Sequence, residues 1–247
     1  MLRPRDAFID IILCFGTWLY EPSVRGGMKL ASLYSGGKDS TFSMYLAEQM
    51  GHDIPYMVNI VPKDPAAMIF HTPNLNLVPL MAESMGRKLV TADSTGTEEG
   101  DMDGLRRVLD GLDVDGIVTG AVWSDYQWDR INRVCGEMGL TVMSPLWRKD
   151  QDLVMDAFLD SGIKAIIIGC YAEGLDRSWL GRELDRDAVE ELKEIRSRTG
   201  MSIMGEGGEY ESLTIDSPMH SRPLRILESE VEWSRHGGTM HVRSATL

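Results

Sequence analysis

The residues best suited to chemistry follow an apolar, strand-like run at 30–34, and they read Ser35-Gly36-Gly37-Lys38-Asp39-Ser40. Glycines let a backbone approach an anion closely, and the N–H groups at the start of a following helix point toward it. Lys38 adds positive charge, while Ser35 and Ser40 add hydroxyl donors. A carboxylate beside phosphate needs a cation, so Asp39 indicates Mg²⁺. The sequence therefore predicts a phosphate-binding loop with a magnesium ligand; the alternative is a Gly-Gly turn that caps a helix.

This loop, residues 35–40, lacks the spacing of a Walker A motif, which requires Gly, four residues and then Gly-Lys-Ser/Thr. It resembles the pyrophosphate loop, Ser-Gly-Gly-x-Asp-Ser, of the N-type ATP pyrophosphatases. Members of that superfamily adenylate a substrate and release pyrophosphate, and they do not transfer the terminal phosphoryl group. The resemblance implies ATP as the nucleotide and an adenine nucleotide alpha-hydrolase-like fold.

The elements that must position the loop alternate between apolar runs and amphipathic stretches. Strands are predicted at 30–34, 56–61, 88–91, 116–119, 140–143 and 165–169, and helices at 39–50, 75–85, 105–112, 125–138 and 152–161. This alternation predicts an α/β fold, with a Rossmann-like parallel sheet covered by helices on both faces and right-handed crossovers. Ligands of such sheets bind beyond the carboxyl ends of the strands. We therefore expect an ATP-binding domain at 28–171.

The pattern changes near Ala172. A charged helix is predicted at 187–198, and two strands with period-two alternation at 224–233 and 240–247. His236-Gly237-Gly238 lies between these strands and predicts a hairpin loop. We therefore expect a smaller α+β region at 172–247 that binds the substrate.

Residues 1–27 are expected to lie outside the core. The apolar stretch 7–20 follows Arg3 and Arg5 as in a signal peptide, but Asp10 interrupts it and no small-residue cleavage site follows. The stretch is too short to span a bilayer. Met28 is a natural start for the first strand, so we interpret 1–27 as an extension with no part in the chemistry. An over-long gene prediction would account for it.

Charge and cysteine content restrict the partners. The net charge of −13 argues against an extended nucleic-acid surface, where clustered Lys and Arg are expected. Cys14, Cys135 and Cys170 contain no CxxC pair, which indicates neither a disulfide framework nor a zinc site and fits a reducing cytoplasm. Each is expected to be a small buried side chain. No nucleic-acid or membrane partner is expected, and the sequence leaves the oligomeric state open, a homodimer included.

Two further polar groups follow predicted strands. His71 begins the sequence His-Thr-Pro-Asn, which is either a site loop or a turn in which Asn74 caps the next helix. Gly120 comes directly after the strand at 116–119, and a helix start containing Asp125 follows it. The polar residues of that start, Asp125 and Gln127, either line a site or cap the helix, and Arg130 either reaches a phosphate or acyl-adenylate or is a surface charge.

An acidic, glycine-rich segment, Gly205–Ser212, is the third group. It contains Glu206, Glu209 and Glu211 among three glycines. This much negative charge on a flexible loop is costly unless it meets a cation. The alternative is a solvated acidic loop.

Taken together, SGGKDS, FHTPN, GAVWSDYQ with an arginine one turn later, PLW, LGR and GEGGEYES resemble, in this order, the diphthine–ammonia ligase family. The likeness covers residues 28 to about 223. Members use ATP and ammonium to convert the carboxylate of diphthine, a modified histidine on elongation factor 2, to an amide. The eukaryotic members are expected to carry additional C-terminal domains, so this chain resembles the compact form typical of archaea.

The resemblance implies a role for each matched residue. ATP would be held by the loop and its neighbours, Ser35, Gly36, Gly37, Lys38, Asp39, Ser40, His71 and Gly120. Substrate would contact Asp125, Tyr126, Gln127, Arg130, Trp147, Gly207, Gly208, Tyr210 and Glu211. The catalytic residues would be Lys38, Asp39, Glu206 and Glu209, with Asp39 as the Mg²⁺ ligand. The carboxylate would first become an acyl-adenylate, and Glu206 or Glu209 would deprotonate ammonium.

The acceptor and the nitrogen source follow from the same resemblance. The trimethylammonium group of diphthine would be recognised by Glu209, Glu211, Tyr210 or Trp147 through charge and cation–π contact. No glutaminase pattern is visible, so free ammonium is expected. Two rival interpretations remain: another pyrophosphate-loop enzyme, such as a tRNA thiolase or lysidine-type ligase, and a non-catalytic adenine-nucleotide sensor.

Overall fold

A computed structural model describes residues 27–62, 73–95 and 97–247, and these form two compact units. Unit 1 contains the described residues of 1–34, 39–71 and 87–148; unit 2 contains those of 35–38, 72–86 and 149–247. The expected boundary after residue 171 thus falls inside unit 2. The expected extension, apart from Gly27, lies outside the described residues, as does His71. Within the described ranges, no helix is long and apolar enough to cross a membrane.

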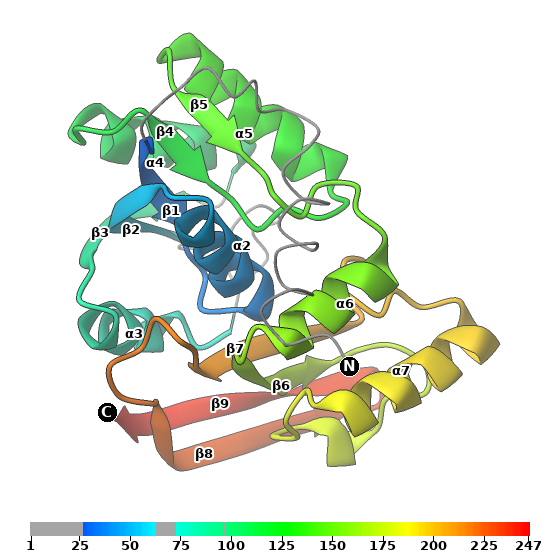
Figure 1. Ribbon diagram of the computed structural model, residues 1–247. Helices are drawn as coiled ribbons and strands as arrows, with labels where there is room; N and C mark the ends of the chain where they lie inside the picture. The colour runs from blue at the N-terminus through cyan, green and yellow to red at the C-terminus, as the bar shows by residue number, and fades with distance from the viewer. Residues whose placement is uncertain (1–26, 63–72, 96) are drawn as a thin grey trace, which may run out of the picture. The chain divides into compact units, whose positions relative to one another are not determined.

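Unit 1 is built on the predicted parallel sheet (Figure 1). Its strands are β1 (Lys29–Leu33), β2 (Asp53–Pro62), β3 (Lys88–Ser94), β4 (Gly116–Val118) and β5 (Thr141–Met143). Their order is β3-β2-β1-β4-β5, and every pairing is parallel. The chain therefore adds β2 and β3 on one side of β1, and then β4 and β5 on the other side of it. This makes the carboxyl ends of β1 and β4 a topological switch point, where α/β sheets bind ligands.

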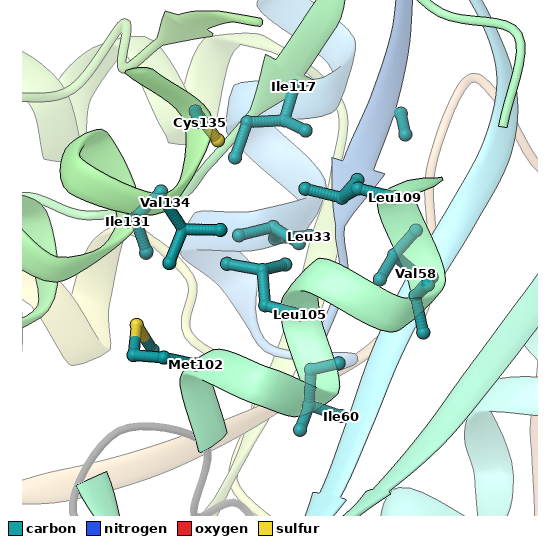
Figure 2. Packing of buried hydrophobic residues seen from close by; sticks show 12 residues of the cluster. Leu33, Val58, Ile60, Met102, Leu105, Leu109, Ile117, Ile131, Val134 and Cys135 are labelled. Atoms are coloured by element: carbon teal, nitrogen blue, oxygen red, sulfur yellow. The ribbon is translucent and has the colours of Figure 1, made fainter. Parts of the chain in front are cut away.

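Helices cover both faces of this sheet, as predicted. They are α2 (Lys38–Gln49), α4 (Glu98–Asp110) and α5 (Asp125–Glu137). Alternation along β1 sends Ala31 and Leu33 into a cluster with α4 and α5, while Leu30 and Ser32 are buried on the α2 face. Figure 2 shows Leu105 of α4 beside Val134 of α5, with Leu33 of β1 next to them.

Helix α4 begins seven residues before the predicted start at 105. Thr97 accepts a hydrogen bond from the Gly100 N–H and so caps the helix, and acidic residues fill its first turn. These carboxylates interact favourably with the positive end of the helix dipole and so stabilise the start of the helix. The prediction began too late because it followed the apolar face, which a polar first turn does not show.

Unit 2 contains a separate antiparallel sheet (Figure 1). Its strands are β6 (Lys164–Cys170), β7 (Tyr210–Asp216), β8 (Arg225–Ser234) and β9 (Gly237–Thr246), in the order β7-β6-β9-β8. The prediction that the buried strand now seen as β6 joins the parallel sheet is wrong, because β6 pairs antiparallel with both β7 and β9. A strand covered on both faces is apolar throughout whichever way its partners run.

The helices of unit 2 are α3 (Val78–Ser84), preceded by the 3-10 turn η1 (Leu75–Leu77), α6 (Gln151–Asp160) and α7 (Arg186–Thr199), with the 3-10 turn η2 at Arg177–Trp179. Asp150 and Asp185 cap α6 and α7. The expected cap by Asn74 is wrong: its side chain makes no cap bond and instead bonds the Met240 carbonyl at 2.9 Å and the Val242 N–H at 2.7 Å. The β8–β9 turn is Arg235-His236, so the glycines of the predicted loop lie in β9.

Both cysteines in the described residues are buried, as predicted. Burial raises the pKa of the Cys135 thiol and of the Cys170 thiol to about 12. Neither is therefore a thiolate near neutral pH, and neither is a candidate nucleophile.

Two histidines make stability depend on pH. Burial lowers the pKa of His52 and of His220 from the ordinary 6.5. The His52 Nδ1 accepts the Met28 N–H, and the His220 Nδ1 lies 2.6 Å from the Ser217 hydroxyl. The unfolded chain binds protons at higher pH than the folded chain, so stability is complete above about pH 6.5 and falls as pH drops through 6.5 toward the lowered values.

We therefore expect the urea midpoint of unfolding to fall between pH 7.5 and pH 5.5, and to fall less in a His220→Asn variant. Urea titrations at both pH values provide the measurement. The exposed Ser229 offers the control, since Ser229→Asn introduces the same side chain without removing a histidine and should leave the pH dependence unchanged. An equal pH dependence in the wild type and His220→Asn would contradict the assignment to His220.

Candidate active site

The first four residues of the phosphate-binding loop are bonded to β7 within unit 2. The Gly36 carbonyl accepts the Thr214 N–H at 2.8 Å, and the Lys38 N–H donates to the Ser212 hydroxyl at 3.1 Å. Gly36 has a φ of +87°, which glycine adopts without strain. Ser212 is the last residue of the acidic segment, so two motifs separated by more than 160 residues are joined directly.

The side chain of Lys38 is buried, with 2% of its surface exposed. Its Nζ donates to the Met204 carbonyl at 2.6 Å and lies 5.3 Å from the centre of the Tyr210 ring. A buried ammonium requires hydrogen-bond acceptors or a π face, and here the acceptor comes from Met204 and the π face from Tyr210, the first residue of β7. This arrangement holds a positive charge in the loop that is expected to bind phosphate.

The acidic segment is a compact, internally bonded turn. The carboxylate of Glu209 accepts the Ser202 N–H at 2.9 Å with one oxygen and the Gly207 N–H at 2.7 Å with the other. The Tyr210 hydroxyl donates to the Ile203 carbonyl at 2.6 Å. Gly205 has a φ of +77°, and a Cβ there would lie 2.8 Å from the Tyr210 carbonyl oxygen. Glu209 is thus stabilised by backbone N–H groups, whereas sequence reasoning looked for a cation.

The other carboxylates of the segment belong to Glu206 and Glu211. Both residues are half-buried, and Glu211 faces Gly169 across the β6–β7 pairing. Gly207 and Gly208 are exposed. The segment thus runs from a turn with exposed backbone into the first three residues of β7.

The remaining loop residues, Asp39 and Ser40, start α2 in unit 1. A Cβ added to Gly120 would lie 2.6 Å from the Ser40 nitrogen and 2.7 Å from the Asp39 carbonyl carbon. Gly120, the second residue after β4, therefore touches the first turn of α2, at the switch point of the sheet. Tyr34, just before the loop, is fixed by the Val58 carbonyl at 2.8 Å and the Asn59 amide at 2.8 Å.

A side chain at position 120 should disrupt this approach. We expect Gly120→Ala to destabilise the folded state by about 1–3 kcal/mol, because its Cβ overlaps backbone that cannot rotate away. Gly37→Ala is the matched comparison: its Cβ would sit 3.5 Å from the nearest atoms, so folding should be retained. Its methyl group should still weaken ATP binding about tenfold by blocking close approach of phosphate.

Urea unfolding and ATP titration of both variants provide the measurement. Normal stability of Gly120→Ala would contradict the close approach, and normal ATP affinity of Gly37→Ala would contradict the phosphate role of the loop.

The loop residues fit a magnesium ion that is bound together with substrate phosphates. Among the described residues, no group of three or more His, Cys, Asp or Glu side chains forms a cage for a metal ion. Mg²⁺ usually keeps water molecules and is bound through one or two carboxylates together with substrate phosphates. The single, half-buried Asp39 at the start of α2 suits that second arrangement.

The start of α5 places most of the predicted acceptor residues together in unit 1. Ser124 is the N-cap, and its hydroxyl accepts the Gln127 N–H, so the capping alternative for Asp125 and Gln127 is wrong. The guanidinium of Arg130 stacks on Tyr126, 3.4 Å from the ring centre, and pairs with Glu98 at 2.7 Å. Hydrogen bonds from Arg130 and Tyr126 hold the pKa of Glu98 below its usual range.

Sequence reasoning missed Glu98 and Arg148. Both carboxylate oxygens of Asp125 lie 2.6 Å from an Arg148 nitrogen, and Trp147 stacks on Trp128 at 5.1 Å. Glu98 could have been found because Thr97 before it is a typical helix-capping residue. The sequence around Arg148 does not indicate which residues its side chain contacts.

Comparisons with known proteins identify the family. Residues 28–142 match the model described as the diphthamide synthase N-terminal domain, and residues 150–247 match the diphthamide synthase C-terminal domain. The chain is 34% identical over 225 residues to the diphthine–ammonia ligase of Danio rerio, covering 82% of this chain and 88% of that protein. It is 30% identical to that of Schizosaccharomyces pombe, covering 83% of this chain and 37% of the relative.

These lengths correct one expectation. The fission yeast relative is much longer than the match, as expected for eukaryotic members, but the Danio rerio relative is not. Among solved structures, the U34-tRNA thiolase NcsA of Methanococcus maripaludis aligns with 83% of this chain and 79% of its own, at 16% identity and a TM-score of 0.43. A likeness this low supports no inference.

Proposed function

The chain belongs to the diphthamide synthase family, and from this premise we propose that it amidates diphthine on elongation factor 2 with ATP and ammonium. As a member, it is a ligase that forms a carbon–nitrogen bond. The amide product is diphthamide, and the nucleotide products are AMP and pyrophosphate. Because elongation factor 2 acts in the cytoplasm, the enzyme would act there too, as a monomer or a homodimer.

The reaction must first give the carboxylate a leaving group. A carboxylate oxygen attacks the α-phosphorus of ATP, the bond to the β-phosphate oxygen breaks, and pyrophosphate departs. The Lys38 ammonium and the loop N–H groups, apart from that of Lys38 itself, which donates to Ser212, would stabilise the charge that develops on the departing group. Asp39 would hold Mg²⁺, which would supply further positive charge at the phosphates. Gly120 keeps the start of α2 close to the end of β4, where ATP is expected to lie.

Ammonia then attacks the acyl carbon and AMP leaves. Ammonium has no lone pair, so it must lose a proton before it attacks. Glu206 and Glu209 are our candidates to bind the cation and take that proton. The oxygens of Glu209 accept two backbone N–H groups, and such bonds stabilise the charged form of a carboxylate and weaken it as a base, so we propose Glu206 as the base and Glu209 as its support.

The protein substrate would contact two groups of residues. One follows β4 and β5 in unit 1 and contains Asp125, Tyr126, Gln127, Arg130 and Trp147. The other is the acidic segment of unit 2, with Gly207, Gly208, Tyr210 and Glu211. His71 is proposed on the nucleotide side from the family resemblance alone.

One observation carries the proposal beyond family membership. The lysine of the phosphate-binding loop is buried and donates to the carbonyl of Met204, which directly precedes the acidic segment, and its backbone N–H is bonded to Ser212 at the end of that segment. A ligase that adenylates a carboxylate needs the phosphate-binding group next to the residues that handle the acceptor. A Gly-Gly turn that only caps a helix, the alternative interpretation of the loop, would not require such a buried lysine.

An amidation assay tests this function. Elongation factor 2 carrying diphthine is incubated with the protein, ATP, Mg²⁺ and ammonium, and both the mass of the modified peptide and the nucleotide products are measured. Conversion of carboxylate to amide with stoichiometric AMP is the expected result. AMP without amidation would move the acceptor to another substrate, as for a tRNA-modifying relative, and bound ATP without turnover would indicate a nucleotide sensor.

A further inference from the structure

One cation in unit 1 lies over two indole rings. The guanidinium carbon of Arg148 is 4.9 Å from the centre of the Trp123 ring and 5.2 Å from that of Trp147. Trp147 also stacks on Trp128, with an interplanar angle of 12°. The Asp125 carboxylate contacts the same guanidinium with both oxygens at 2.6 Å. Two ring faces and a carboxylate around one positive group are the components of an aromatic cation site.

The position of this cluster matches that of a ligand site. Trp123 follows β4, which ends at Val118, and Trp147 follows β5, which ends at Met143. Both therefore extend from the carboxyl ends of parallel strands, where ligands of such sheets bind. Trp123 is one of the few large hydrophobic side chains that are exposed among the described residues, with 42% of its surface accessible.

Arg148 occupies this place at a conformational cost. Its φ is +55°, and Asn74 is the only other non-glycine residue with positive φ in the part of the chain that the structure describes. The Arg148 N–H donates to the Val122 carbonyl at 2.8 Å, which holds the backbone there. The side chain itself is 46% exposed and its Asp125 partner 64% exposed, so the ion pair is weak and the guanidinium is exchangeable.

We propose that Trp123, Trp147 and Asp125 bind the quaternary ammonium group of the diphthine side chain, and that Arg148 occupies this site until the substrate displaces it. The identity of the ligand rests on the proposed function; the cation site rests on the geometry. A quaternary ammonium has no N–H groups that need acceptors, and it is attracted to ring faces and to a carboxylate. Ammonium, the second substrate, is small and strongly hydrated and suits oxygen ligands better.

The test uses tetramethylammonium as the probe and the full chain as the protein. Saturation-transfer NMR on the probe's methyl protons measures binding without turnover, and sodium chloride holds the ionic strength constant. Trp123→Leu should reduce the binding constant about fivefold. Arg148→Gly, in which glycine accepts the positive φ, should increase it about two- to fivefold by removing the competitor. Trp233→Leu, on β8, is the matched control and should bind as the wild type does.

The amidation assay supplies the second measurement. Trp123→Leu should raise the KM for the diphthine-bearing protein about five- to tenfold and leave the KM for ATP unchanged. Wild-type probe binding by Trp123→Leu, or weaker binding by Arg148→Gly, would overturn the proposal. So would a rise in the KM for ATP alone, which would assign the rings to adenine stacking. Probe binding that depends on Trp123, without any amidation by the wild type, would support the cation site and reject the proposed function. Amidation by Trp123→Leu with an unchanged KM for the diphthine-bearing protein would support the proposed function and reject the cation site as its binding site.

Discussion

Lys38→Met should slow pyrophosphate release by about 10²–10³-fold, which is the usual loss when a preorganised group that stabilises developing charge is removed. Methionine keeps the unbranched stem in its buried place and removes the ammonium. ATP should still bind through the loop N–H groups, so the loss should appear in the rate of adenylation. Rapid-quench measurement of pyrophosphate in the presence of the diphthine-bearing protein tests this result.

The variant needs a check on folding, because Lys38 donates to the Met204 carbonyl. Loss of that donor leaves a carbonyl without its partner, at a cost of about 1–3 kcal/mol. Urea unfolding measures the cost directly. Lys193→Ala, which removes surface ion pairs to Asp156 and Glu190, is the control for loss of a lysine charge and should release pyrophosphate normally. An unchanged rate in folded Lys38→Met would reject the phosphate role.

The second large effect should separate the two catalytic carboxylates. Glu206→Gln should lower amidation by about 10²-fold and flatten its pH dependence, while leaving ATP binding and stability close to normal, because it removes a proton acceptor. Glu209→Gln should act differently. Its amide nitrogen would face a backbone N–H at Ser202 or Gly207, so we expect a loss of stability of about 1–3 kcal/mol.

Steady-state amidation from pH 6 to 9, ATP titration and urea unfolding distinguish the two roles. Glu190→Gln, on the exposed face of α7, is the control for loss of a surface carboxylate. If both active-site variants amidate at the wild-type rate, neither residue takes part in the reaction. A normal pH profile in Glu206→Gln with a flattened one in Glu209→Gln would make Glu209 the base and Glu206 its support.

The helices and the parallel sheet of unit 1 were predictable, whereas the pairing of β6 was not. Helix α2 follows two glycines and a lysine and carries an apolar face, and its prediction is confirmed, while the phosphate-binding role of the loop at 35–40 stays a prediction. The antiparallel pairing of β6 has no such signal, because its partners lie more than 40 residues away in β7 and β9. Strand β7 was not predicted at all, since the glycines before it conceal where the strand begins.

The candidate site divides in the same way. Residue types indicated that Lys38 and the acidic segment matter, but only the fold brings the Met204 carbonyl to the lysine. The carboxylate of Glu209 was predicted to need a cation, and the folded backbone supplies N–H donors in its place. Arg148 was missed because its importance comes from two ring faces and a positive φ, neither of which is visible in the sequence around it.

The bond between Lys38 and Met204 has a thermodynamic consequence. A polyphosphate that takes hydrogen bonds from this ammonium competes with the carbonyl, so it loosens the turn that Met204 belongs to. By reciprocity, any partner that binds the loosened turn must tighten the binding of the polyphosphate by the same factor. The order in which the two substrates associate would then be a property of one shared hydrogen bond, and amide hydrogen exchange at 201–210 with and without ATP would report its strength.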